Sequence, residues 1–229
     1  MFTLSPSIYS ADLLDLKKVL DQAKDFEHIH LDIDDGNFVK GISFGVDFVE
    51  QIAAYTGVEL DAHLEVLNPL DYVEGLGKAG VKTLSAHIEV LDFPSVFLSR
   101  THKQGMKAGL ALNLKTPLSF IEPYKDDIDL LLFVSVEAGE EGLPFHSSVL
   151  NKIKEARKLF GEYLPIWVDG GISENNLKEV VEAGADAVVV GRAVFKAEDF
   201  KQAYDRLIGL GRSYERGCRN KSLGNKSSN

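Results

Sequence analysis

The sequence is poor in cysteine and proline and has no long apolar run. One cysteine, Cys218, and seven prolines among 229 residues exclude a disulfide-stabilised scaffold and a proline-rich or collagen-like chain. No segment approaches the roughly 18 consecutive apolar residues of a membrane-spanning helix. The opening residues, MFTLSPSIYS, lack the basic and apolar regions of a secretory signal. These absences predict a cytoplasmic protein that does not bind a membrane.

Positive charge is scarce as well. The chain has 25 Lys and Arg residues against 35 Asp and Glu residues, a formal net charge of -10. Such a surface does not favour nucleic acid or anionic lipid as a partner. A negatively charged substrate would therefore need to be bound by backbone N–H groups or by a nearby cation. The oligomeric state is left open, with a homo-oligomer among the alternatives.

The overall composition, 45% hydrophobic and 26% charged, is typical of one compact domain. Residues 211–229 stand apart, because they are basic, rich in Gly, Ser and Asn, and without apolar periodicity. We therefore expect a single domain over residues 1–210, followed by a disordered polar tail.

Short apolar or β-branched runs alternate with helical patterns eight times along the chain. The expected strands are 2–9, 28–33, 58–65, 81–87, 106–113, 128–136, 164–169 and 186–190. The expected helices are 11–25, 45–55, 69–79, 93–104, 117–124, 146–160, 173–183 and 197–210. The first strand is not followed by the G-x-G-x-x-G turn of an open dinucleotide-binding sheet. The pattern thus predicts an α/β fold, a closed (βα)8 or TIM barrel, whose site lies at the C-terminal ends of the strands.

Polar residues alternate with apolar ones at the ends of the second and third strands. A period of two places one set on each strand on the inward face: His30, Asp32 and Asp34 on the second strand, and Asp61, His63 and Glu65 on the third. Asp169 ends the seventh strand. Inward polar groups are costly unless they are paired or used. Two imidazoles with several carboxylates suit Zn, Fe, Mn or Co, so we expect one divalent metal ion.

Two glycine-bearing turns follow the seventh and eighth strands, and both lead into helical patterns. They contain Gly170 and Gly171, and Gly191 with Arg192. Backbone N–H groups at such turns hold a phosphate in many barrels, which would let an acidic protein bind a sugar phosphate.

Several motifs together resemble the ribulose-phosphate 3-epimerase family over about residues 2–208. They are Pro6-Ser7-Ile8, HIHLDIDDGNFV from His28, LDAHLEV from Leu60, Asn113 within GLALNLKTP, and VDGGI from Val168. The resemblance implies metal ligands at His30, Asp32, His63 and Asp169, with Asp32 and Asp169 also the acid/base pair. It further implies that Ser7 and His63 contact the substrate and that Gly170, Gly171 and Gly191 hold its phosphate, with Arg192 nearby.

The sequence also departs from the family pattern. The family has methionines around the reacting carbons, where this chain has Asp34, Glu65 and Val134. A unit charge about 5 Å from a developing anion costs about 3 kcal/mol at an effective dielectric constant of 20, so the two carboxylates need neutralisation. The glycine-rich loop of the sixth strand is replaced by EAGEEGL, from Glu137 to Leu143.

Three functions stay open at this point. The first is a metal-dependent epimerase that interconverts ribulose 5-phosphate and xylulose 5-phosphate. The second is an epimerase of a hexulose phosphate, and the third is a non-catalytic sugar-phosphate binder. Decarboxylases and Schiff-base aldolases on this barrel are disfavoured, because the second and sixth strands lack the lysine that they use.

Overall fold

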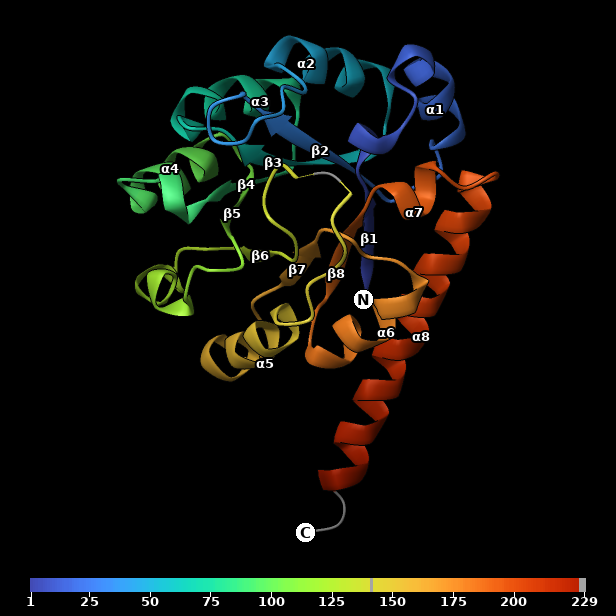
Figure 1. The fold of residues 1–229 in the computed structure, drawn as a ribbon. Coiled ribbons are helices and arrows are strands. Elements are labelled where there is room, and N and C mark those ends of the chain that lie inside the picture. Colours follow the sequence, from blue (N-terminus) through green and yellow to red (C-terminus); the bar gives the residue numbers. More distant parts are fainter. Residues whose placement is uncertain (141, 227–229) are drawn as a thin grey trace.

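Eight parallel strands wrap into one barrel in the computed structural model, which describes residues 1–140 and 142–226 (Figure 1). The strand order is β1-β8-β7-β6-β5-β4-β3-β2, and a parallel bridge between Ser7 and His30 joins β1 to β2 across the seam. The predicted TIM barrel is confirmed. The strands are β1 Thr3–Pro6, β2 His28–Asp34, β3 Glu59–Glu65, β4 Thr83–His87, β5 Lys107–Leu112, β6 Leu130–Val134, β7 Ile166–Asp169 and β8 Ala187–Val190.

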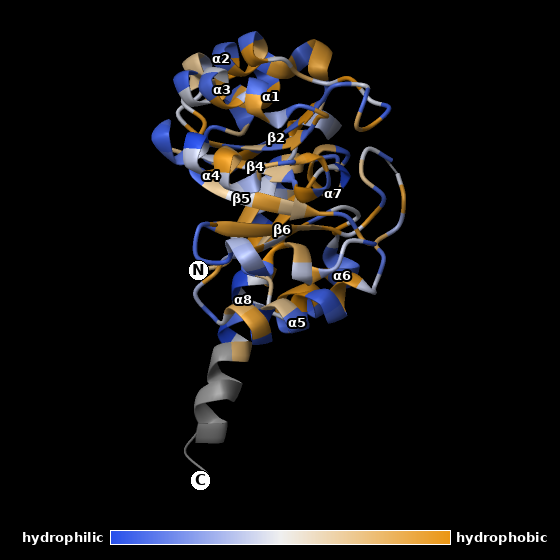
Figure 2. Cartoon of the chain, turned by 90° about the vertical axis from the view of Figure 1, so that its left-hand side faces the viewer, coloured by the Kyte–Doolittle hydropathy of each residue, from blue (hydrophilic) through white to orange (hydrophobic). Residues whose placement is uncertain are grey.

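Helices surround the barrel and bury their apolar sides against it (Figures 1 and 2). They are α1 Leu16–Gln22, α2 Val46–Tyr55, α3 Val73–Ala79, α4 Pro94–Lys103, α5 Val149–Phe160, α6 Glu174–Ala183, α7 Arg192–Phe195 and α8 Phe200–Lys226. Short 3-10 turns lie at Ile8–Ser10, Leu13–Asp15, Pro69–Asp71, Ile88–Val90, Leu118–Phe120 and Glu122–Tyr124. Within the described residues, no helix is both long and apolar enough to cross a membrane.

The expected alternation decides which strand residues face the helices. On β2, Leu31 and Ile33 are fully buried beneath the helical layer, whereas His30 and Asp32 turn toward the barrel interior. The apolar outer face fixes each strand in the barrel, so the inner face can carry polar side chains at one end.

One expected helix is absent. The segment 117–124 forms two 3-10 turns, Leu118–Phe120 and Glu122–Tyr124, instead of an α-helix. Pro123 has no N–H to donate and disfavours the α conformation at the residue before it. The apolar spacing of this segment therefore indicated buried positions correctly, but not their backbone conformation.

The last helix extends past the boundary expected at residue 210. α8 runs from Phe200 to Lys226, and Gly211 is buried against the ring of Phe2. Arg212 donates to both carboxylate oxygens of Glu27 at 2.6 Å. At least the start of the basic segment thus packs on the barrel, because a glycine there lets the helix approach Phe2 closely. The expectation for residues 227–229 lies outside the described residues.

Two glycines of α8 give opposite predictions. A Cβ on Gly209 meets nothing within 4 Å, whereas a Cβ on Gly211 would overlap the Phe2 ring. Gly209→Ala should stabilise the fold by up to about 1 kcal/mol through helix propensity. Gly211→Ala should destabilise it by about 1–3 kcal/mol through overpacking. Urea unfolding of both variants measures the two free energies, and equal effects would show that Gly211 is not held against Phe2.

Candidate active site and metal centre

The register of β2 on β3 pairs the polar residues of the two strands. His30 lies opposite Asp61, Asp32 opposite His63, and Asp34 opposite Glu65. Side chains at matched positions of parallel neighbours point to the same face, so three polar pairs are stacked inside the barrel toward its C-terminal end.

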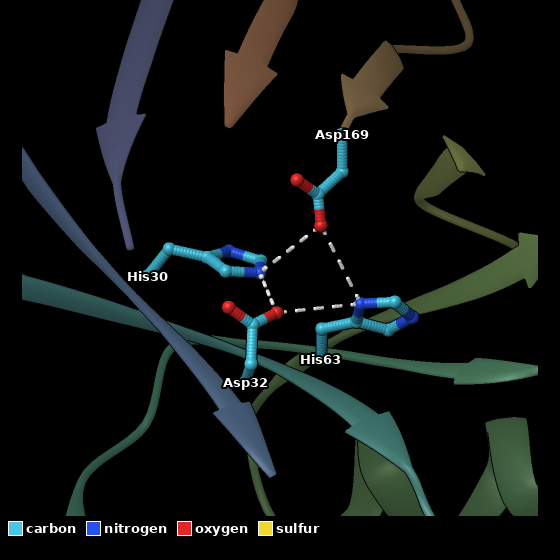
Figure 3. A group of neighbouring side chains, drawn as sticks. All are labelled: His30, Asp32, His63 and Asp169. Atoms are coloured by element: carbon cyan, nitrogen blue, oxygen red, sulfur yellow. Dashed lines mark hydrogen bonds and ion pairs between the residues drawn. The ribbon is translucent and has the colours of Figure 1, made fainter. Parts of the chain in front are cut away.

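Asp169 approaches the middle of this stack from β7, across the barrel (Figure 3). Its Oδ2 atom lies 4.0 Å from His30 Nε2 and 3.8 Å from His63 Nδ1. Asp32 Oδ1 lies 3.1 Å from His30 Nε2 and 3.7 Å from His63 Nδ1. The four residues expected from the sequence to bind a metal ion are therefore brought together, with ligand atoms within 4.8 Å of one another.

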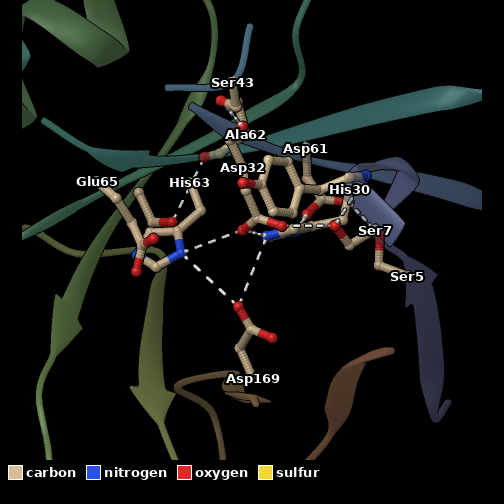
Figure 4. A network of polar contacts seen from close by, with 12 residues as sticks. Ser5, Ser7, His30, Asp32, Ser43, Asp61, Ala62, His63, Glu65 and Asp169 are labelled. Atoms are coloured by element: carbon tan, nitrogen blue, oxygen red, sulfur yellow. Dashed lines mark hydrogen bonds and ion pairs between the residues drawn. The ribbon is translucent and has the colours of Figure 1, made fainter. Parts of the chain in front are cut away.

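Two further residues hold this cluster in place (Figure 4). Asp61 is hydrogen-bonded to His30 Nδ1, which turns Nε2 of the same ring toward Asp32. Ser5 donates a hydrogen bond to Asp61. The sequence places Asp61 on the inward face but does not reveal this role, because it depends on contacts among three different strands. Ser7, a predicted substrate contact, donates to Asp32 Oδ2 at 2.5 Å and so also orients that carboxylate.

The cluster favours positive charge. Burial opposes the charged form of His30, yet the carboxylates of Asp61 and Asp32 raise its pKa well above the usual range. Burial also opposes charge on His63, but the nearby carboxylates of Asp169, Asp32 and Glu65 raise its pKa to about 10. The pKa of Asp32 is lowered, because the two histidines outweigh its burial. A divalent ion bound here would displace the protons that these raised pKa values favour.

The donor set fits such an ion. Both ring nitrogens of His63 are buried without a hydrogen-bond partner in the described structure. Three of the four distances between histidine nitrogens and carboxylate oxygens in the cluster, at 3.7 to 4.0 Å, are too long for hydrogen bonds. Two ligand atoms, each about 2.1 Å from a tetrahedral ion, lie roughly 3.4 Å apart, so only small movements would close the site. Two imidazoles and two carboxylates suit Zn, Fe, Mn or Co without selecting one of them.

A cavity of about 580 Å³ opens above the cluster at the C-terminal ends of the strands. The residues expected to contact substrate line it: Ser7, Asp32, Asp169, Gly170, Gly171, Gly191 and Arg192. His63 lies below, fully buried. Ser10 and Ser173 also line the cavity and add hydroxyl groups beside the glycine turns, although no motif singled them out.

The first glycine turn has little room for side chains. Gly170 and Gly171 have φ values of 102° and 65°, which strongly favour glycine. The Ser135 hydroxyl lies within hydrogen-bond distance of the carbonyls of Asp169 and Gly170 and shares its one proton between them, which fixes the turn. The capping box between Ser173 and Asn176 then starts α6 directly after it. The result is a rigid, backbone-lined pocket at a helix start, as phosphate binding requires.

Comparison with known proteins agrees with this geometry. The model of the ribulose-phosphate 3 epimerase family matches residues 3–195. The chain belongs to this family.

Curated relatives cover nearly the same length. The ribulose-phosphate 3-epimerase of Bacillus subtilis (strain 168) is 38% identical over 218 residues, which are 91% of this chain and 99% of the relative. That of Synechocystis is 40% identical over 208 residues, 87% of this chain and 90% of the relative. A solved structure, orotidine 5'-phosphate decarboxylase from Pyrococcus horikoshii OT3, has a TM-score of 0.65 at 18% identity. It covers 92% of this chain and 99% of its own, and it shows the shared fold alone.

This family member has an acidic cavity wall. Asp34, Glu65 and Val134, the three positions where the family pattern has methionine, all line the cavity. Asp34 and Glu65 are each 7% exposed. Burial, followed by the charges of Glu65 and Asp32, raises the pKa of Asp34 to about 8. The structure therefore also places these two carboxylates where their negative charges must be neutralised.

The contact between Asp61 and His30 predicts a measurable effect on metal affinity. Asp61→Asn should weaken binding of Zn²⁺ about 10- to 100-fold, because the carboxylate orients the ring and raises its basicity. Calorimetric titration of metal-free protein measures this affinity. Asp71→Asn, which changes an exposed carboxylate, is the control and should bind like wild type. Unchanged affinity in a folded Asp61→Asn variant would show that His30 does not bind the ion.

Proposed function

We propose that the chain is a metal-dependent epimerase that interconverts ribulose 5-phosphate and xylulose 5-phosphate. One observation carries the proposal: Asp32 and Asp169, from opposite sides of the barrel, line the same cavity directly beside two buried histidines. Family membership and the names of the relatives support the reaction.

Inversion of a carbon next to a carbonyl requires two proton transfers on opposite faces. One group removes a proton and the other returns one to the far side of a flat ene-diolate. Asp32 comes from β2 and Asp169 from β7, so they would lie on opposite faces of a substrate held between them. The hydrogen bond from Ser7 keeps the Asp32 carboxylate oriented during this exchange.

His30, Asp32, His63 and Asp169 would hold the divalent ion. When bound, the ion supplies positive charge that stabilises the oxygens of the ene-diolate. Because Asp61 holds His30 in a fixed orientation, this ligand would need little rearrangement on binding. His63 is fully buried below the cavity, so we assign it to the ion and not to direct contact with the substrate.

The phosphate is assigned to the backbone N–H groups of Gly170, Gly171 and Gly191. Arg192 is exposed at the cavity rim and adds a positive charge. The glycine turns would thus hold the phosphate at one end of the cavity, while Asp32 and Asp169 react with the sugar at the other end. The expected cytoplasmic location and homo-oligomeric assembly stay predictions.

A deuterium exchange assay tests the function. Metal-loaded protein in deuterium oxide should introduce one deuteron into ribulose 5-phosphate as it forms xylulose 5-phosphate. Asp32→Asn and Asp169→Asn should each slow epimerisation by about 10²- to 10⁴-fold, the usual contribution of a general acid or base. Asp71→Asn is the control. Deuterium incorporation into a hexulose phosphate but not into ribulose 5-phosphate would show that the substrate is a six-carbon sugar. Binding of the sugar phosphate without deuterium incorporation would show a non-catalytic binder.

The phosphate assignment has its own test. A Cβ on Gly191 would overlap Ser10 Oγ at the cavity wall, whereas a Cβ on Gly45 meets nothing within 4 Å. Gly191→Ala should raise the KM for the sugar phosphate about tenfold or more with a smaller effect on kcat, while Gly45→Ala should leave both unchanged. An unaltered KM in Gly191→Ala would place the phosphate elsewhere.

A further inference from the structure

His87, at the end of β4, is held in the same way as His30. Its Nδ1 atom lies 3.0 Å from Glu89 Oε2, and its side chain is fully buried. Burial raises the pKa of Glu89, but hydrogen bonds from His87 and Thr116 outweigh it and lower the pKa to about 2. A carboxylate on one ring nitrogen that leaves the other free is the usual support of a metal-binding histidine.

The free nitrogen of His87 faces an acidic group. Its Nε2 atom lies 3.7 Å from Glu65 Oε1, which is too far for a hydrogen bond. In the described structure, His87 Nε2, His63 Nε2 and Asp34 Oδ1 are buried without hydrogen-bond partners. Buried polar atoms are seldom left unsatisfied, so the two histidine nitrogens beside Glu65 indicate a missing ligand.

The stacked pairs of β2 and β3 show what kind of ligand is missing. In the two lower pairs a histidine faces an aspartate, but in the upper pair Asp34 faces Glu65. Two buried carboxylates side by side repel each other, so either one of them takes up a proton or a nearby cation compensates their charge. Each lower pair contains a histidine of its own, whereas the upper pair has the neighbouring rings of His63 and His87 beside it.

We propose that His63, Glu65 and His87 bind a second divalent metal ion, on the side of His63 away from Asp32 and Asp169. Their ligand atoms lie within 4.8 Å of one another, and all three residues are buried. Two imidazoles and one carboxylate form a set that Zn²⁺, Co²⁺ and Fe²⁺ accept. Asp34 beside Glu65 supplies a second negative charge, so that the buried ion is compensated.

His63 would then lie between two ions. Its Nδ1 atom faces Asp32 and Asp169, and Figure 3 shows the other ring nitrogen pointing away from them. A neutral imidazole has one free lone pair, so binding through both nitrogens requires the ring to release its remaining N–H proton to solvent. The ring of Phe38 packs beside the second site, with its centroid 4.7 Å from that of His87. This site goes beyond the proposed function, which needs only the first ion.

Metal stoichiometry tests the inference. Protein freed of metal by a chelator is mixed with excess CoCl₂ and passed through a desalting column, and bound Co²⁺ is measured by elemental analysis. Wild type should bind two ions per chain, whereas Glu65→Gln, His87→Phe and Asp169→Asn should each bind one. The control Glu59→Gln removes an exposed carboxylate at the other end of β3 and should bind two. Circular dichroism verifies that each variant is folded.

The pattern of losses separates the two sites. A single Co²⁺ in wild type that is lost in Asp169→Asn and kept in Glu65→Gln overturns the second site and leaves the first. A single ion lost in Glu65→Gln and kept in Asp169→Asn supports the second site and contradicts the first. If a variant does not fold, anomalous scattering from Co²⁺-soaked wild-type crystals decides the question: a peak on each side of the His63 ring supports the proposal, and a peak on one side alone next to Asp169 overturns it.

Discussion

The in-register pairing of β2 with β3 is the constraint on which the site depends. It places Asp32 beside His63 and His30 beside Asp61, all on the inner face of the barrel. A slip of one residue would turn every one of these side chains outward and bring Leu31 and Ile33 inward. The apolar outer residues therefore set the geometry of the polar inner ones, because their burial under the helices fixes the register.

This arrangement places several carboxylates close together inside the barrel. Asp32, Asp34, Asp61, Glu65 and Asp169 lie in or beside one small region of the barrel, and histidines balance only part of their charge. This imbalance explains the raised pKa values of His30 and His63. A divalent ion bound at this site would compete with protons for the same positions.

The same contact between a carboxylate and a histidine occurs at two places in the barrel. Asp61 holds His30 and Glu89 holds His87, each through Nδ1, so that each Nε2 atom points toward a carboxylate. The repetition is a consequence of the barrel, since both histidines turn toward its interior with a carboxylate within reach of Nδ1. Where the family pattern has methionine, Asp34 and Glu65 place two carboxyl groups in the cavity wall.

The sequence by itself determined the order of the eight strands and the inward polar faces of β2 and β3, because a two-residue period is a local property of the chain. The resemblance of its motifs to the epimerase family then singled out the four residues of the central cluster. Pro123 was also a local signal, against an α-helix at residues 117–124, but the apolar spacing of that segment favoured a helix. Tertiary structure alone decided that Asp61 is hydrogen-bonded to His30 and that Asp34 lies beside Glu65. It also decided that His87 faces this carboxylate pair and that α8 packs on Phe2 at Gly211. Each of these contacts joins residues far apart in sequence, and only strand register and helix packing set the distances between them.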